Sequence, residues 1–346
     1  MEHRERVLLA TSLRDPDRPP LDLGGPSWSI ADASPYGYRK LCEHLGLIDE
    51  HYELKMRSRI VSRVAEPVLK QLDIDFRYVG MSEPFRMLEN GVVEDAFKVK
   101  WRPIGDHYFP MDDRAPLAKA KTAGDIEEFD GWPDPKDPIF LRGWGEARRL
   151  REKTDYAVGL DAGPAKQVFH RYQWMRGFNQ WFWDMRFNPE LYRALADKIF
   201  EFGSALLTEY FPRVADYIDV VVISDDLGAQ TGPLISEEHF KTFVKPWLKR
   251  RIKFLRRMIP RDVKILLHCC GSVYNFIPHF VECGVNILNP IQPTAKDMEP
   301  ERLKKGFGGR ICFHGGIDQL KVLPHAQPGE VRRHVTTVLD LSLIHI

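Results

Sequence analysis

A histidine and a cysteine stand two positions apart in the triplet His268-Cys269-Cys270. The triplet overlaps the end of the apolar run Lys264–Cys269, which predicts a β-strand. Side chains alternate between the two faces of a strand, so His268 and Cys270 share one face and Cys269 points to the other. An imidazole and a thiolate on one face form half of a zinc site. The alternative is an ordinary core, since free cysteine is commonly buried.

Acidic residues follow two other predicted strands. Asp161 comes directly after Tyr156–Leu160, and Asp225 and Asp226 come directly after Asp219–Ser224. Adjacent residues in an extended segment point to opposite faces, so only one of the pair Asp225 and Asp226 is expected to enter a pocket. Such carboxylates can position a substrate or exchange protons with it. The alternative is that they cap turns and helices.

A third candidate region is the predicted strand Ile311–His314, which carries Cys312 and His314 on one face. Alternate strands of a barrel contribute side chains to one interior layer, so both residues are candidates for the third zinc ligand. The two glycines that follow could instead let the backbone approach a ligand, with Cys312 as a packing residue. Asp318, just beyond them, is a candidate substrate contact.

The elements that must position these residues alternate along the chain. The predicted strands are Ile74–Val79, Tyr156–Leu160, Asp219–Ser224, Lys264–Cys269, Val285–Leu288 and Ile311–His314. The clearest helix begins at Pro189, with Asn188 as its N-cap. A second opens at Ser236 and should kink at Pro246, and a third covers 272–283.

Strands that alternate with helices predict βαβ units around a parallel sheet. No Gly-x-Gly-x-x-Gly motif follows a strand, so a dinucleotide-binding fold has no support. We therefore predict a (β/α)8 barrel of the TIM type over residues 71–346, with its site at the carboxyl ends of the strands. Residues 1–70 are expected to form a loop-rich N-terminal cap, and the proline-rich stretch of about 92–142 an irregular insertion that could contain short strands.

The composition is that of an ordinary globular protein, with 43% hydrophobic and 29% charged residues among 346. A formal charge of +1 shows no excess of positive charge that would favour binding to nucleic acid or to an anionic membrane. No apolar run is long enough to cross a bilayer. Five cysteines are too few for a disulfide scaffold, and an odd number cannot all form pairs. We expect a cytoplasmic protein with reduced thiols and a small-molecule substrate.

Five separated motifs, in order, carry a resemblance to a known family. They are Ser224-Asp-Asp-Leu-Gly-Ala-Gln-Thr-Gly-Pro-Leu-Ile-Ser236, Phe243-Val-Lys-Pro246, His268-Cys-Cys-Gly-Ser272, Gly284-Val-Asn-Ile-Leu-Asn-Pro290 and Gly315-Gly-Ile-Asp318. Together they resemble the uroporphyrinogen decarboxylase-like superfamily, over roughly Asp73 to the end of the chain. The resemblance implies a (β/α)8 barrel. That superfamily includes the decarboxylase itself, zinc-dependent cobamide methyltransferases with a His-x-Cys motif, and relatives that demethylate methoxy or methylamino compounds.

Two departures separate the chain from the decarboxylase. That enzyme carries an Arg-Gln-Ala-Gly-Arg-Tyr motif that grips the porphyrinogen carboxylates, and no such string occurs between Met1 and His51. Its essential aspartate near the end of the first strand corresponds here to Gly80. The methyltransferase branch is therefore the better match.

The methyltransferase resemblance is itself incomplete. Zinc-dependent relatives hold a further thiolate near the last barrel strand, and this chain ends at Leu341-Ser-Leu-Ile-His-Ile346 before such a segment. We expect that the last barrel unit is missing and that this tail is not native coding sequence. The position of a carboxylate ligand in some thiol-methylating relatives corresponds to Asn289 or Gln292.

The leading hypothesis is a zinc-dependent methyltransferase or demethylase that works with a corrinoid carried by a partner protein. The expected metal ligands are His268, Cys270 and Cys312. The expected catalytic residues are Asp225 and Asp226, and the expected substrate contacts are Asp161, Gln230 and Asp318. One rival hypothesis is a metal-free decarboxylase of uroporphyrinogen or another acid. Another is a degenerate barrel that binds a ligand without catalysis.

Overall fold

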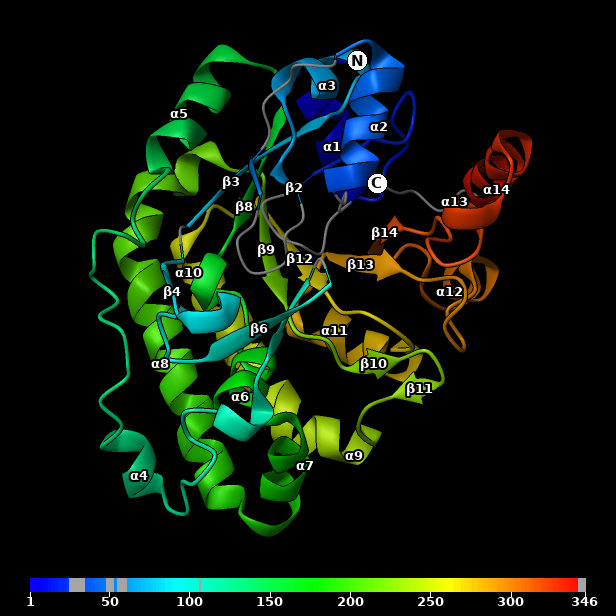
Figure 1. Cartoon of the computed structure of the whole chain (residues 1–346). Helices are drawn as coiled ribbons and strands as arrows, with labels where there is room; N and C mark the ends of the chain where they lie inside the picture. Colours follow the sequence, from blue (N-terminus) through cyan, green and yellow to red (C-terminus); the bar gives the residue numbers. More distant parts are fainter. Residues whose placement is uncertain (25–34, 48–52, 55–60, 82, 106, 342–346) are drawn as a thin grey trace.

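The centre of the computed structural model is a parallel sheet of six strands (Figure 1). The structure describes residues 1–24, 35–47, 53–54, 61–81, 83–105 and 107–341. The strands are β3 (Phe76–Gly80), β8 (Ala157–Asp161), β9 (Val220–Ser224), β12 (Lys264–His268), β13 (Ile287–Ile291) and β14 (Cys312–Gly315). Their order across the sheet follows their order along the chain, as in a (β/α)8 barrel. The predicted parallel α/β architecture is confirmed.

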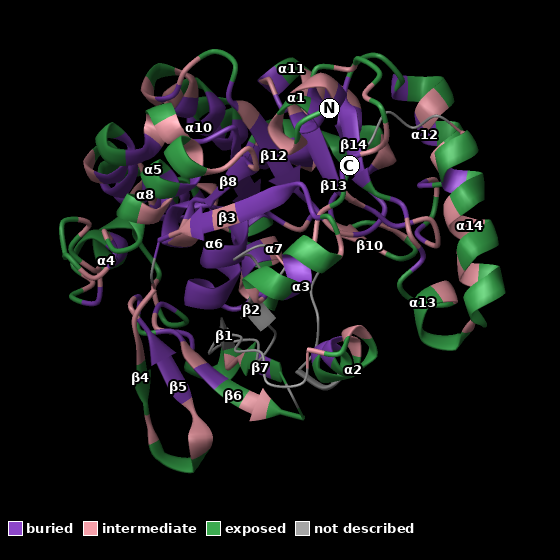
Figure 2. Cartoon of the chain, turned by 90° about the horizontal axis from the view of Figure 1, so that it is seen from above, coloured by how far each residue is buried: buried purple, intermediate pink, exposed green. Residues whose placement is uncertain are grey.

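The two faces of this sheet bury different sets of side chains. Val221 and Ile223 belong to the large core between the sheet and the outer helices, whereas Val220 and Val222 belong to a smaller cluster on the inner face. Figure 2 shows the strands as buried beneath more exposed helices. Because strand side chains alternate, His268 lies on the inner face with Leu266. The inner face is therefore apolar near the amino ends of the strands and polar near their carboxyl ends.

The long helices pack on the outer face of the sheet. Helix α8 (Pro189–Val214) begins as predicted, and the Asn188 side chain accepts a hydrogen bond from the N–H of Leu191. The predicted second helix is divided into α9 (Glu237–His239), a π-helical turn and α10 (Lys245–Met258). The break comes just before Pro246, which occupies the first turn of α10, where proline is tolerated.

The remaining helices are shorter or lie at the periphery. They are α1 (His3–Thr11), α2 (Pro35–Leu45), α3 (Glu66–Gln71), α4 (Ala123–Glu127), α5 (Trp144–Lys153), α6 (Phe169–Arg176), α7 (Phe178–Phe187), α11 (Ile277–Cys283), α12 (Pro300–Phe307), α13 (Val322–His325) and α14 (Pro328–Asp340). Helix α11 is shorter than predicted, because a 3-10 turn precedes it. No helix in the described part of the chain has the length and apolar character needed to cross a bilayer.

A regular antiparallel sheet overlaps the predicted insertion, and its first strand lies before residue 92. Its strands are β4 (Phe85–Met87), β5 (Val93–Asp95), β6 (Lys100–Ile104) and β7 (His107–Pro110), paired in that order. Two further short pairs are β1 (Glu53–Leu54) with β2 (Val61–Arg63) and β10 (Gly228–Ala229) with β11 (Gly232–Pro233). The buried Arg171 of α6 bonds Asp95 and Glu83, each at 2.8 Å. This ion pairing ties the insertion to the helix that follows β8.

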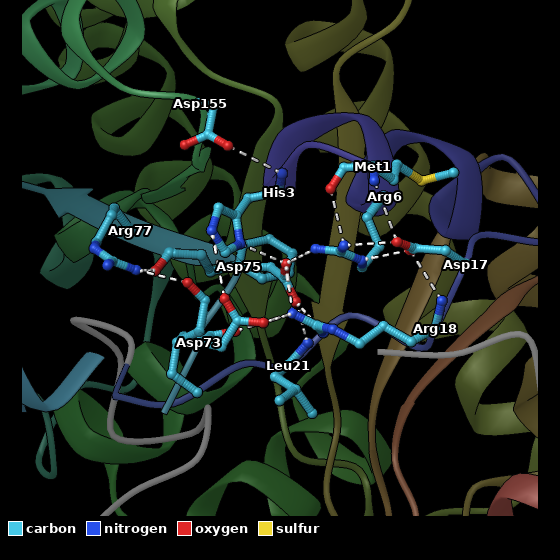
Figure 3. A network of polar contacts seen from close by, with 12 residues as sticks. Met1, His3, Arg6, Asp17, Arg18, Leu21, Asp73, Asp75, Arg77 and Asp155 are labelled. Carbon is cyan, nitrogen blue, oxygen red and sulfur yellow. Dashed lines mark hydrogen bonds and ion pairs between the residues drawn. The ribbon is translucent and has the colours of Figure 1, made fainter. Parts of the chain in front are cut away.

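The N-terminal segment covers the amino ends of the barrel strands (Figure 3). Asp75, directly before β3, accepts hydrogen bonds from His3, Arg6 and Arg18, and its side chain is fully buried. The first residues therefore form an anchored helix. The expectations for residues 25–34 and 342–346 lie outside the described residues, and the predicted division at residue 70 stays a prediction.

Candidate metal centre

Three potential metal ligands converge at the carboxyl ends of β9 and β12. Asp226, His268 and Cys270 each offer one ligand atom, and these atoms lie within 4.8 Å of one another. The Sγ of Cys270 is 3.2 Å from Nε2 of His268, which is 3.5 Å from Oδ1 of Asp226. We call these three residues the metal group. His268 is buried, whereas Asp226 and Cys270 are half-buried, so the group is reachable from one side.

A buried amide orients the His268 ring. Nδ1 of His268 lies 2.6 Å from Oδ1 of Asn289 on the neighbouring strand β13, and an amide oxygen can only accept a hydrogen bond. The ring proton therefore lies on Nδ1, and Nε2 presents its lone pair to the metal group. Burial lowers the pKa of His268, so the imidazole is neutral near pH 7. Neutral imidazole is the form that binds metals.

Asp226 is held by its neighbours as a carboxylate. Its Oδ1 accepts a hydrogen bond of 2.7 Å from the N–H of Cys270, and its Oδ2 lies 3.5 Å from Nε2 of His170. Burial works against the charge, but His170, His268 and this N–H outweigh it and lower the pKa of Asp226. Within the described residues no lysine or arginine pairs with Asp226. The negative charge of Asp226 is therefore available to a metal cation.

Two glycines let the backbone pack closely beside the metal group. Gly271 has φ +81°, and a Cβ there would stand 2.4 Å from the carbonyl carbon of Gly228. A Cβ on Gly228 would stand 2.6 Å from the carbonyl oxygen of Cys270. The N–H of Gly271 donates to Oε1 of Gln292 at 2.6 Å. The loop that carries Cys270 is thus fixed by contacts that only glycine permits.

One wall of the site comes from α6 and the insertion. The His170 ring stacks on Trp174, with ring centroids 5.4 Å apart, and Trp174 packs edge-on against Trp101 of β6. Nε2 of Gln167 lies 3.3 Å from Nδ1 of His170. His170 is not among the site residues predicted from the sequence. His170 lies in the first turn of α6, at the carboxyl end of the sheet where barrel sites are built, and this position was the available signal.

Asp225 and Asp226 lie on opposite sides of the chain, as the alternation of side chains predicts. Asp225 turns away from the metal group. Its Oδ1 accepts hydrogen bonds from the N–H groups of Phe169 and His170, at 2.8 and 3.1 Å, and its Oδ2 pairs with Arg251 at 3.2 Å. Burial raises the pKa of Asp225. This carboxylate caps the start of α6, and its expected catalytic role stays a prediction.

The structure does not bring the predicted substrate contacts to the metal group. Asp161 lies at the end of β8, where it pairs with Lys166 at 3.0 Å and caps a turn through the N–H of Gly163. Gln230 is exposed between β10 and β11. Oδ1 of Asp318 accepts N–H bonds of 2.9 Å from the two residues 320 and 321 and so closes a turn. Their proposed substrate contacts stay predictions.

Cys312 lies outside the metal group, which corrects its assignment as a ligand. It shares a strand face with His314, as predicted, but it is buried in the apolar inner cluster with Ile287 and Leu266. Two residues along a strand correspond to about 6.6 Å, so Cys312 lies toward the amino end of the barrel. Burial raises the pKa of Cys312 to about 12. His314 contacts Asn289 instead of the metal group.

The donor set of the metal group fits zinc. Zinc binds imidazole nitrogen, thiolate sulfur and carboxylate oxygen, and catalytic zinc sites use three protein ligands with a fourth position open. Hard cations such as Mg²⁺ and Ca²⁺ prefer oxygen ligands alone. His268 also has the hydrogen-bonded second nitrogen that is typical of metal-bound histidine. The same residues would hold zinc without any other side chain entering the group.

Comparisons with known proteins place the barrel in a family. Residues 160–345, more than half of the chain, match the sequence model described as uroporphyrinogen decarboxylase (URO-D). The chain belongs to this family. A solved structure of a methyltransferase from Methanosarcina mazei is similar, with a TM-score of 0.64, 14% identity, and coverage of 100% of this chain and 91% of that one. At this identity the likeness establishes the fold. No curated protein matches.

Proposed function

We propose that this protein is a zinc-dependent methyltransferase or demethylase, which moves a methyl group between a small substrate and a corrinoid protein or a thiol. The observation that carries the proposal is the convergence of Asp226, His268 and Cys270 at the carboxyl ends of two barrel strands. Family membership and the fold shared with the methyltransferase from Methanosarcina mazei support it. Zinc, when bound, supplies Lewis acidity toward a substrate thiol or a methoxy or amine group.

The residues of the site have distinct tasks in this proposal. His268, Cys270 and Asp226 hold the metal, and the N–H of Cys270 keeps the Asp226 carboxylate turned toward it. His170, 3.5 Å from Asp226, is the neighbouring side chain that can exchange a proton with the substrate. Trp174 supports the His170 ring and excludes water from that side.

The test combines zinc content with methyl transfer from methylcobalamin to a small thiol, which loses its proton and becomes a thioether while the cobalamin is released as cob(I)alamin. Wild-type protein should hold about one zinc per chain and catalyse the transfer. Cys270→Ser should lose both, with zinc affinity lower by more than about 100-fold. Cys312→Ser is the matched control, because it changes a buried cysteine outside the metal group and should keep the zinc. Wild-type protein without zinc affinity, or a Cys270→Ser variant that keeps zinc and activity, would contradict the proposal.

A further inference from the structure

A chain of buried polar side chains continues from His268 away from the metal group. Nδ2 of Asn289 lies 2.7 Å from Nδ1 of His314 on β14. Nε2 of His314 lies 3.0 Å from Oδ2 of Asp22, which also accepts a hydrogen bond of 2.5 Å from the Tyr78 hydroxyl on β3. The Asp22 and His314 side chains are nearly inaccessible to solvent. Three contacts thus link His268 to Asp22 in the N-terminal segment.

The proton positions along this chain have one consistent direction. Burial, followed by the Asp22 charge, raises the pKa of Tyr78 well above its usual range, so its hydroxyl stays protonated and donates to Asp22. The Asp22 carboxylate accepts from Nε2–H of His314. Nδ1 of His314 then carries a lone pair and accepts from the Asn289 amide, whose oxygen accepts from Nδ1–H of His268. Each donor meets an acceptor.

A second arrangement of the same side chains would disable His268. If the Asn289 amide turned over, its NH₂ group would face His268, and the ring proton would have to move to Nε2. Protonated Nε2 has no lone pair for a metal. Reversal would also place Nδ1–H on His314 and leave its Nε2 lone pair facing the Asp22 carboxylate, which is repulsive in a buried site. The negative charge of Asp22 therefore selects one direction.

We infer that Asp22 is a positioning residue, which acts through His314 and Asn289 to hold His268 in the tautomer that can bind metal. The N-terminal segment supplies this carboxylate between the two edge strands of the six-stranded sheet, since Tyr78 belongs to β3 and His314 to β14. This inference deepens the proposed function, because it concerns the same histidine. It also makes the N-terminal segment part of the site.

The network at the amino ends of the strands fixes Asp22 through its neighbour. The N–H of Leu21 donates to Oδ2 of Asp75 at 2.7 Å, and the Leu21 carbonyl accepts from the N–H of Asp75 at 2.9 Å. Figure 3 shows Leu21 beside Asp75 with Arg18 and Arg6 around it. These two hydrogen bonds between Leu21 and Asp75 hold the backbone next to Asp22 against the start of β3 and so fix the position of Asp22.

The test is ¹⁵N NMR of the histidine side chains in chelator-treated, metal-free protein. His268→Gln and His314→Gln variants assign the two rings. Wild-type protein should carry the proton of His268 on Nδ1 and that of His314 on Nε2. Asp22→Asn should mix the His268 tautomers and lower zinc affinity about 10-fold, measured by chelator competition. If Asp22→Asn does not fold, two measurements still decide the inference. Wild-type protein must show the tautomers given above, and His314→Gln must show mixed tautomers of His268.

Two control variants separate this role from general packing. Tyr78→Phe keeps the Asp22 charge, so the His268 tautomer should not change. Asp17→Asn removes a half-exposed carboxylate from the same segment and should leave both tautomer and zinc affinity as in wild type. A His268 ring protonated on Nε2 in wild type, or an Asp22→Asn variant identical to wild type, would overturn the inference. Predicted tautomers with no zinc binding would refute the proposed function alone.

Discussion

The two ends of the barrel both gather acidic and basic side chains, but they arrange them differently. At the amino end, Asp75 is fully buried, and each of its carboxylate oxygens receives at least two hydrogen bonds, from side chains and from the N–H of Leu21. At the carboxyl end, the ligand atoms of Asp226, His268 and Cys270 point toward one another within 4.8 Å. The first arrangement compensates its charges internally, and the second leaves a centre that a cation would complete.

The kinds of partner at the two ends explain the difference. Arginine keeps its charge and cannot serve as a metal ligand, so Arg6 and Arg18 on Asp75 make a permanent structural contact. The side-chain partners of Asp226 are the imidazoles of His170 and His268, and a neutral imidazole can bind a metal. The basic partners of a buried carboxylate therefore indicate its role: arginine indicates a structural ion pair, and histidine indicates a candidate metal site.

The largest expected effect comes from Asp75→Asn. Removing the buried member of this ion-pair network leaves Arg6 and Arg18 with only the more exposed carboxylates of Asp17 and Asp73, so the free energy of unfolding should fall by about 3–5 kcal/mol in urea titrations. The zinc affinity of the chains that remain folded should change little. Asp17→Asn, at a half-exposed carboxylate beside the same arginine, should destabilise much less. If both variants lost the same free energy of unfolding, the claim that burial makes the Asp75 ion pairs more important for stability would be wrong.

The same variant should respond to pH in a defined direction. Burial alone would raise the pKa of Asp75, but the N–H of Leu21 and the side chains of His3, Arg18 and Arg6 together lower it. A carboxyl group with a lowered pKa stabilises the fold above its unfolded pKa of about 3.9. That stabilisation disappears as the pH falls through the folded value. The stability difference between wild type and Asp75→Asn should therefore be full at pH 7 and shrink in acid.

The neighbouring carboxylates Asp225 and Asp226 should separate structural from metal-binding roles. Asp226→Asn should weaken zinc binding by about 10- to 100-fold, because a charged ligand is lost, with little effect on unfolding. Asp225→Asn should mainly lower the thermal midpoint, because Arg251 and the start of α6 lose their partner. Chelator competition and thermal melting measure the two effects. The opposite pattern would exchange the roles of the two residues.

A glycine pair gives a smaller, steric test. Gly271→Ala should displace the loop that carries Cys270, because the new Cβ meets Gly228 at 2.4 Å. We expect zinc affinity to fall several-fold. Gly309→Ala is matched for backbone conformation, with φ +78° against +81°, but it has open space around the new Cβ. It should cost only the conformational strain of about 1–2 kcal/mol and leave zinc binding unchanged.

The smallest effect concerns the reactivity of the cysteines. Of the five cysteines, Cys270 is half-buried and the other four are buried. Burial raises the pKa of Cys269 well above its usual range, and that of Cys312 to about 12. A thiol reagent should therefore modify Cys270 first, and the buried thiols on the order of 10-fold or more slowly. Zinc should protect Cys270, and faster modification of Cys312 would contradict its burial.

Regular local patterns made much of the barrel predictable. The six parallel strands and the N-cap at Asn188 follow from apolar runs and from local capping chemistry. The shared face of His268 and Cys270 follows from strand alternation alone. These features depend on residues close together in the sequence, so the sequence could reveal them.

The parts that the sequence did not reveal depend on packing between distant segments. Asp22 reaches His314 across 292 positions, and no periodic pattern connects them. Cys312 was assigned to the correct face but to the wrong depth, because alternation gives the side of a strand and not its position along the barrel. The sequence allows short strands in the insertion, but their pairing into one antiparallel sheet, with Pro103 and Pro110 in its last two strands, follows from no local pattern.

The most direct test of the central claim is X-ray absorption at the zinc K-edge of the zinc-loaded protein. The metal group predicts one sulfur neighbour at about 2.3 Å and nitrogen and oxygen neighbours at about 2.0–2.2 Å. Cys270→Ser should abolish the sulfur signal, and Cys312→Ser should leave it unchanged. Two or more sulfur neighbours, or none, would contradict a centre built from Asp226, His268 and Cys270.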